Sequence, residues 1–202
     1  MPIINIREQK NLLRAKHKKI RTACSEEIRN SLDKVLFEKF IELKEYKECK
    51  ILFAFVSMPI EINTYPILEK AIADGKILAL PKCRQKEPVM DFYSVASLDD
   101  LKEGKYSIME PDTNLCQIIT DYSEGLCLVP GLSFDLYGYR LGFGKGYYDR
   151  FLNLFGGATV GLCYSRCVEQ KLPHGIYDKA VDILITEKFT NDTRNVFEKG
   201  MV

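Results

Sequence analysis

Two short apolar runs flanking one amphipathic helix constrain the fold of this chain more than any other feature. The runs are ILFAFV (Ile51 to Val56) and ILAL (Ile77 to Leu80), and Thr64 and Gly75 are placed to begin and end the helix between them. A strand, helix, strand unit favours parallel pairing with a right-handed crossover, and strands that are apolar throughout indicate a sheet covered on both faces. The sequence predicts an α/β fold of three layers, a mostly parallel sheet with helices on both faces.

Further helices and strands are predicted on either side of this unit. Ile6, Leu13 and Ile20 lie seven apart, which indicates an amphipathic helix, and Ser25 caps a second helix that runs to about Leu43. Further strands are expected at Met90 to Val95, Leu126 to Val129, Thr159 to Tyr164 and Val181 to Thr186, with a helix from Tyr147 to Phe155. Because no flexible linker interrupts the pattern, we expect a single domain over residues 1–202.

Composition excludes several classes of protein. With 46% hydrophobic and 28% charged residues, the chain has the composition of a globular protein. A net charge of +1 argues against nucleic acid as a partner. No apolar run approaches the roughly 18 residues that span a bilayer, and the N-terminus lacks the apolar core of a signal peptide. We therefore expect a cytoplasmic monomer with no membrane contact.

The seven cysteines are odd in number and scattered, as is usual for reduced thiols. Cys163 and Cys167 with His174 are a conceivable metal site. Because Cys163 lies in an apolar strand-like run, packing in the core is the favoured interpretation.

Charged residues follow the helical period near the N-terminus. Arg7, Lys10 and Arg14 share one helix face and either grip a polyphosphate together or face solvent. The spacing alone favours solvent, as for most charged surface helices.

The run LVPGLSFDLYGYRLGFGKGYYDRFL (Leu128 to Leu152) reads as a phosphate-binding loop that opens onto a helix. Gly142, Gly144 and Gly146 allow main-chain N–H groups to approach an anion, and the cations Arg140 and Lys145 flank them. Since ligands of open α/β sheets bind beyond the carboxyl ends of the strands, this loop and the segment from Met58 to Asn63 should line one crevice.

Neither well-known glycine fingerprint fits this loop. In the dinucleotide pattern Tyr147 occupies the place of the third glycine, and in the Walker A pattern Tyr139 and Gly146 stand where a glycine and a Ser or Thr are needed. The glycines alone leave two alternatives open, a nucleotide cradle of another kind or a structural turn.

The complete stretch VPGLSFD, GYRLG and GKGYYD closely resembles the signature of the 5-formyltetrahydrofolate cyclo-ligase family, also called 5,10-methenyltetrahydrofolate synthetases. KNLLR, SMPIEINT, GKYSIMEP and VDILIT follow in the family's order, so that the resemblance covers nearly the whole chain. It implies the NagB/RpiA/CoA-transferase-like fold. It also implies an enzyme that uses ATP and Mg²⁺ to convert 5-formyltetrahydrofolate into 5,10-methenyltetrahydrofolate, with release of ADP and phosphate.

The resemblance implies roles for individual residues. Lys145 and Arg140 would stabilise the transferring phosphoryl group, and Tyr147 would lie nearest the formyl group. Phe143 stands where some relatives carry a cation. The implied ATP-binding residues are Lys10, Arg14, Arg140, Leu141, Gly142, Phe143, Gly144, Lys145, Gly146, Tyr147 and Tyr148.

The folate and the metal have implied residues as well. Asn63 stands where relatives carry an acid, and Tyr106 stands where relatives can have a tryptophan against which folate stacks. The implied folate-binding residues are Met58, Glu61, Asn63, Tyr106, Lys145, Gly146 and Tyr147, and the implied Mg²⁺ ligands are Asp149 and Asp182. Two alternatives to the cyclo-ligase remain, an idle folate- or nucleotide-binding protein and, from fold class alone, a phosphosugar isomerase.

Overall fold

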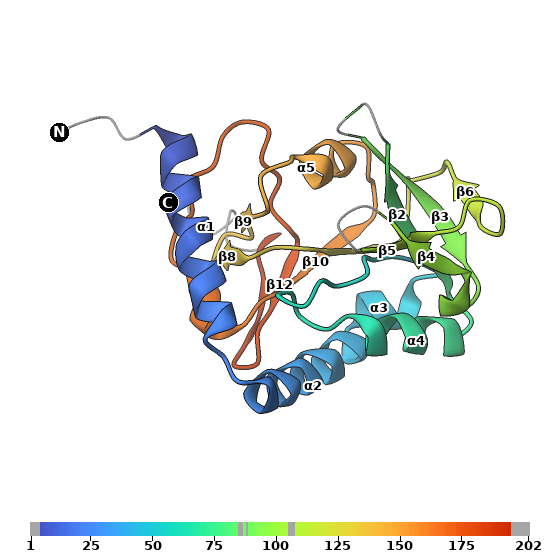
Figure 1. Ribbon diagram of the computed structural model, residues 1–202, viewed down its shortest axis with the longest axis horizontal. Coiled ribbons are helices and arrows are strands. Elements are labelled where there is room, and N and C mark those ends of the chain that lie inside the picture. Colours follow the sequence, from blue (N-terminus) through green and yellow to red (C-terminus); the bar gives the residue numbers. More distant parts are fainter. Residues whose placement is uncertain (1–4, 85–86, 88, 105–107, 195–202) are drawn as a thin grey trace.

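An eight-stranded sheet forms the centre of the computed structural model, which describes residues 5–84, 87, 89–104 and 108–194. Its strands are β1 (Ile51–Phe53), β2 (Ile77–Cys83), β3 (Met90–Val95), β6 (Gln117–Ile119), β7 (Leu126–Val129), β10 (Ala158–Leu162), β12 (Ile183–Ile185) and β13 (Thr190–Asp192). They lie in the order β13-β12-β10-β7-β1-β2-β3-β6 (Figure 1). The strands from β12 to β2 are parallel, while β13, β3 and β6 are antiparallel at the two ends. The predicted α/β class and mostly parallel sheet are confirmed.

Helices lie on both sides of this sheet. They are α1 (Ile6–Thr22), α2 (Glu26–Glu42), α3 (Lys44–Glu48), α4 (Tyr65–Ala73) and α5 (Tyr147–Leu152). Figure 1 shows α2, α3 and α4 together below the sheet, α5 above it and α1 standing across one end. The upper layer therefore contains one short helix, which ends three residues earlier than the sequence predicted.

The first two helices begin at side-chain caps. The Asn5 side chain accepts a hydrogen bond from the Arg7 N–H, and the Ser25 hydroxyl accepts one from the Ile28 N–H. The predicted helices over this part of the chain are confirmed, and the second ends within a residue of Leu43.

The strand, helix, strand unit forms as predicted, but Thr64 does not cap its helix. Thr64 has right-handed helical angles, and its hydroxyl donates to the Phe55 carbonyl instead. The Ser57 N–H in turn donates to the Thr64 hydroxyl. The Ala54 N–H still donates to the Ala79 carbonyl of β2, but Phe55 and Ser57 bond to Thr64 instead, and β1 covers only half of the predicted apolar run. Gly75 ends the helix with a φ of +71°, as expected.

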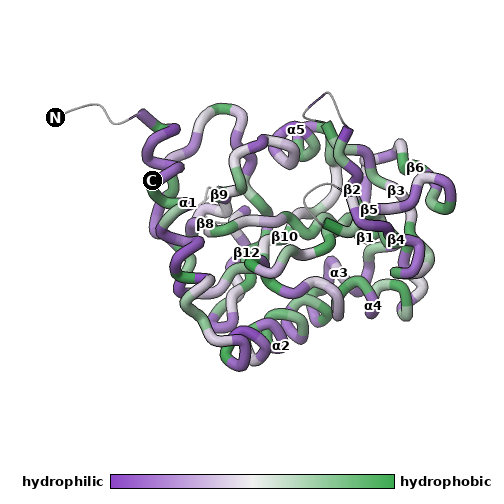
Figure 2. The backbone as a smooth tube through the Cα atoms, in the orientation of Figure 1, coloured by the Kyte–Doolittle hydropathy of each residue, from purple (hydrophilic) through white to green (hydrophobic). Residues whose placement is uncertain are grey.

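The core lies along the central strands. Every residue of β7 is at most 1% exposed, and Figure 2 shows hydrophobic segments gathered in the middle of the molecule and hydrophilic ones along much of α1. Within the described ranges, no helix is both long and apolar enough to cross a membrane.

A small sheet, absent from the sequence prediction, holds the glycine loop over the central one. It consists of β8 (Ser133–Asp135), β9 (Arg140–Leu141) and β11 (Val168–Glu169). Fully buried Asp135 accepts hydrogen bonds from the N–H groups of Tyr137, Tyr139 and Leu172. The loop that leaves β9 thus starts from a fixed position. Two further strands, β4 (Leu101–Glu103) and β5 (Met109–Pro111), form a separate ribbon.

Candidate functional site

Arg14 joins α1 to the glycine loop. Its Nε atom donates a hydrogen bond of 2.8 Å to the Gly142 carbonyl. A Cβ atom at Gly144 would lie 3.2 Å from the guanidinium carbon of Arg14, which shows how closely the loop approaches this side chain. The solvated face that the spacing alone favoured is therefore wrong for Arg14, and the loop and the helix form one positively charged surface.

Lys10 belongs to the same surface through Asp178, a residue that the sequence analysis did not select. Its Nζ atom lies 2.7 Å from the Asp178 carboxylate, and both side chains are less than one fifth exposed. Burial acts to raise the pKa of Asp178, but hydrogen bonds from the Gly175 N–H and Lys10 bring the pKa below its usual value. Arg14 and Arg140 also act electrostatically on this carboxylate. The sequence signal that could have identified Asp178 is an acidic residue shortly before β12.

Arg140 is buried and holds Asp149. Its guanidinium donates to the Asp149 carboxylate at 2.6 Å and to the Lys179 carbonyl at 2.9 Å. Asp149 remains 30% exposed in its side chain. Arg140 thus orients an acid beside the glycine loop, and its role against phosphate stays a prediction.

The three loop glycines do not have equal conformations. Gly144 and Gly146 have φ angles of +94° and +72°, which side chains rarely adopt, but Gly142 has no positive φ. A Cβ atom added at Gly142 would meet no other atom within 4 Å, so that the backbone is open there. Lys145 is exposed beside this opening, while Leu141 is buried in the small sheet. Of the three glycines, Gly144 and Gly146 are therefore required by their backbone angles, whereas Gly142 is not.

A cation from α1 approaches the unusual Phe143. The Nζ atom of Lys18 lies 6.0 Å from the centre of the Phe143 ring. Lys18 thus supplies a positive charge next to Phe143, whose own side chain is uncharged.

Glu61 closes a tight turn at the carboxyl end of β1. Its carboxylate accepts a hydrogen bond from the Met58 N–H at 2.9 Å, and its own N–H donates to the Met58 carbonyl. The side chain is buried, and burial raises its pKa to about 7, against the opposing effects of the Met58 N–H and the Arg21 charge. Glu61 is therefore an acid that can exchange a proton near neutral pH.

Replacing Glu61 with glutamine is expected to change how stability depends on pH. Because its pKa is higher in the folded protein than in the unfolded chain, Glu61 contributes stability that is complete below about pH 4.5 and is lost as the pH rises through about 7. Glu61→Gln lacks this loss. Between about pH 5 and about pH 8, the Tm of the wild type should therefore fall by more than the Tm of the variant. Parallel Tm profiles would contradict the raised pKa.

Asn63 and Tyr106 are less informative. Asn63 is exposed, and its side-chain oxygen accepts a hydrogen bond from the Tyr65 N–H at the start of α4. Asn63 thus accepts the helix-start hydrogen bond that the sequence led us to expect from the Thr64 side chain. Tyr106 lies outside the described residues.

The paired tyrosines of α5 both pack against the core, half-buried. The hydroxyl of Tyr148 is buried and has no hydrogen-bond partner within the described part of the chain. Tyr147 precedes it at the first helical position, next to the glycine loop.

Arg21 connects the two loops of the crevice, a function that the sequence analysis missed. Its guanidinium, almost fully buried, donates to the carbonyls of Ile60, Gly131 and Leu132 and lies over the ring of Tyr164. In the sequence it is one of several cations on α1, and only its burial distinguishes it. Arg21 therefore fixes α1 to the carboxyl ends of β1 and β7.

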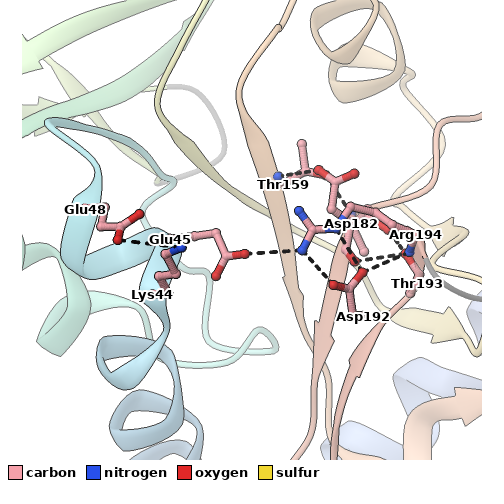
Figure 3. Close-up of polar contacts among 9 residues, drawn as sticks. Lys44, Glu45, Glu48, Thr159, Asp182, Asp192, Thr193 and Arg194 are labelled. Carbon is pink, nitrogen blue, oxygen red and sulfur yellow. Dashed lines mark hydrogen bonds and ion pairs between the residues drawn. The ribbon is translucent and has the colours of Figure 1, made fainter.

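Asp182 lies among other partners. Its carboxylate accepts two hydrogen bonds from Thr159, one from the N–H and one from the hydroxyl, each of 2.8 Å (Figure 3). Both residues stand at the amino-terminal ends of their strands, with the pair Asp192 and Arg194 beside them. Among the described residues, no group of three or more His, Cys, Asp or Glu is arranged to hold a metal. The role of Asp182 as a metal ligand stays a prediction.

The cysteines of the chain are all free, and four are buried. Cys163 and Cys167 lie in the core, as the packing interpretation predicted.

Comparisons with known proteins agree with this arrangement. A probable 5-formyltetrahydrofolate cyclo-ligase of Caenorhabditis elegans is 35% identical over 155 residues, which are 73% of this chain and 74% of the relative. The mouse 5-formyltetrahydrofolate cyclo-ligase is 29% identical and covers 93% of this chain and 98% of its own. The solved structure of 5,10-methenyltetrahydrofolate synthetase from Aquifex aeolicus superposes with a TM-score of 0.79 at 35% identity, over 92% and 93% of the two chains. The model of the 5-formyltetrahydrofolate cyclo-ligase family matches residues 6–187, and the chain is an enzyme that belongs to this family.

Proposed function

We propose that this protein converts 5-formyltetrahydrofolate into 5,10-methenyltetrahydrofolate in a reaction that requires ATP and Mg²⁺. The observation that carries the proposal is the contact of Arg14 with the glycine loop, which gathers cations around an open stretch of backbone. The carboxyl end of β1, where Glu61 lies, faces the same side of the sheet. Two ligands, one phosphorylated and one heterocyclic, thus fit next to each other.

The residues present fit a nucleotide with its metal ion. The open backbone at Gly142 leaves room for phosphate oxygens, with Arg14 bonded to its carbonyl and Lys145 exposed three residues later in the same loop. Mg²⁺ needs only one or two carboxylates in addition to phosphate and water. Asp149 offers one, because Arg140 holds a single oxygen of its carboxylate.

The chain's own residues position and neutralise charge. When bound, ATP supplies the phosphoryl group that makes the formyl oxygen a good leaving group, and N10 then closes the ring as phosphate departs. Lys145 and Arg14 stabilise the negative charge that develops on the transferring group. Arg140 orients Asp149, and Tyr147 lies nearest the formyl group. The enzyme therefore acts mainly through geometry and electrostatics.

The test is direct. Purified protein with 5-formyltetrahydrofolate, Mg²⁺ and ATP is expected to produce the absorbance of the methenyl product, and omission of ATP should abolish it. Saturable binding of both ligands without turnover would support an idle binding protein instead. We further infer that the protein acts as a single-domain monomer in the cytoplasm. Its seven free cysteines suit that reducing compartment.

Asparagine substitutions are expected to identify the metal ligands. Asp149→Asn should raise the Mg²⁺ concentration needed for half-maximal activity by about tenfold or more. For the second ligand we expect Asp178→Asn to have the same effect, because Arg140 acts on both Asp178 and Asp149, whereas Asp182 stands with Thr159 at the amino-terminal ends of β10 and β12. Activity measured against Mg²⁺ at saturating ATP distinguishes the two. An effect of Asp182→Asn alone would restore the assignment made from the sequence.

A further inference from the structure

The hydroxyl of Tyr148 is a buried polar group that lacks a partner. Within the described residues only three side-chain atoms share this property, and the other two, on His17 and Ser133, belong to the packing of α1 and β8. Buried polar groups of folded proteins nearly always form hydrogen bonds, so that each exception needs an explanation. Burial raises the pKa of Tyr148, and the hydroxyl therefore keeps its proton and can both donate and accept.

The surroundings of this hydroxyl place it in the crevice. The groups that act on it electrostatically are Cys127 in β7, Cys83 at the end of β2, Glu61 and Arg140. The ring itself is anchored from the other side by Phe151, whose ring is perpendicular to it with centres 6.4 Å apart. The Tyr148 ring thus packs against the core, and its hydroxyl interacts electrostatically with Glu61, which follows β1, and with Cys83 at the end of β2.

We propose that the Tyr148 hydroxyl binds the heterocyclic ring system of the folate substrate and selects for it together with Glu61. This inference rests on the proposed function and assigns one further residue to the same site. A polar atom on the edge of the bicyclic ring supplies the hydrogen bond that the protein leaves unmade. A substrate without that atom leaves the buried hydroxyl unpaired, which is the arrangement that discriminates most strongly between ligands.

The position of Tyr148 favours folate over the nucleotide, to which the family resemblance assigned this residue. The cations that suit phosphate approach the loop from α1, where Arg14 reaches Gly142. Tyr148 instead interacts electrostatically with Glu61 and with the thiols of Cys83 in β2 and Cys127 in β7. Its neighbours are an acid, two thiols and Arg140. Because the Arg140 guanidinium already donates to Asp149 and to the Lys179 carbonyl, this environment matches the polar edge of a heterocycle better than a phosphate.

Removing this single oxygen tests the proposal. Tyr148→Phe is expected to raise the Kd for 5-formyltetrahydrofolate, measured by calorimetry without ATP, by about tenfold, the usual scale for one lost hydrogen bond in a buried site. The Kd for a non-hydrolysable ATP analogue should stay the same. The Tm should stay equal or rise, because the variant no longer buries an unpaired hydroxyl.

Tyr46→Phe is the matched control, since its buried ring carries a hydroxyl that has a partner, the Asp74 carboxylate at 2.8 Å. This variant should have a lower Tm than the wild type and unchanged Kd values for 5-formyltetrahydrofolate and for the ATP analogue. An unchanged folate Kd in Tyr148→Phe, or a raised Kd for the ATP analogue alone, would overturn the inference. Either result in a wild type that still turns over leaves the proposed function intact, whereas a wild type that neither binds folate nor reacts refutes that function itself.

Discussion

Replacing Lys145 with alanine is expected to lower kcat by about 10²- to 10³-fold, the usual effect of removing one group that stabilises transition-state charge. The side chain is exposed in the glycine loop and has little packing to lose. The free energy of unfolding should therefore change by less than about 0.5 kcal/mol. Steady-state kinetics and a thermal melt of the same preparation measure the two effects.

Two further variants serve as controls for Lys145→Ala. Lys145→Arg retains the charge and should recover part of the activity. Lys34→Ala removes an exposed lysine from α2 and should change neither kcat nor Tm. A kcat within twofold of the wild type in Lys145→Ala, or a loss of stability as large as the loss of activity, would show that Lys145 does not act on the phosphoryl group.

Replacing Arg21 with methionine is expected to cost about 3–5 kcal/mol of unfolding free energy, because three carbonyls lose their donor and a buried acceptor without a partner costs about 1–3 kcal/mol. Methionine fills much of the same space but leaves the carbonyls of Ile60, Gly131 and Leu132 without their donor. Because these carbonyls belong to both loops of the crevice, folate affinity should fall as well.

Denaturant unfolding measures the loss, and Lys19→Ala is the control on the same helix. Lys19 is exposed, so that this variant should remain within about 0.5 kcal/mol of the wild type. A loss below about 1 kcal/mol in Arg21→Met would mean that water replaces the guanidinium at all three carbonyls.

Regular elements with a strong period could be predicted from the sequence. The two N-terminal helices, the parallel pair β1 and β2, and the end of α4 at Gly75 all follow from spacing, caps and continuous apolar runs. The small sheet could not be predicted, because strands of two or three residues carry no readable period. Thr64 misled for a similar reason, since a Thr before a helix has the same sequence signature whether its hydroxyl caps the helix or bonds to a distant carbonyl.

Some residues of the candidate site could likewise be predicted from the sequence, and others could not. The glycine loop, Lys10, Arg14 and Glu61 were identified because a motif brought them together. Arg21 and Asp178 were missed because the partners that tie them to the site, Gly131 and Leu132 for Arg21 and Lys10 for Asp178, lie more than 100 residues away in the chain, and charge alone does not reveal burial. Side chains whose role depends on distant carbonyls or carboxylates are visible only in the folded protein.

The attachment of α1 also governs the order in which the nascent protein can assemble. This helix is synthesised well before the carbonyl that holds Arg14 and two of the three that hold Arg21, which belong to residues 142, 131 and 132. β1 likewise pairs with β2 early, while its other edge waits for β7. During translation an amphipathic helix and an open strand edge are therefore exposed together until most of the chain has left the ribosome, which makes this interval the one in which chaperones and aggregation compete for the protein.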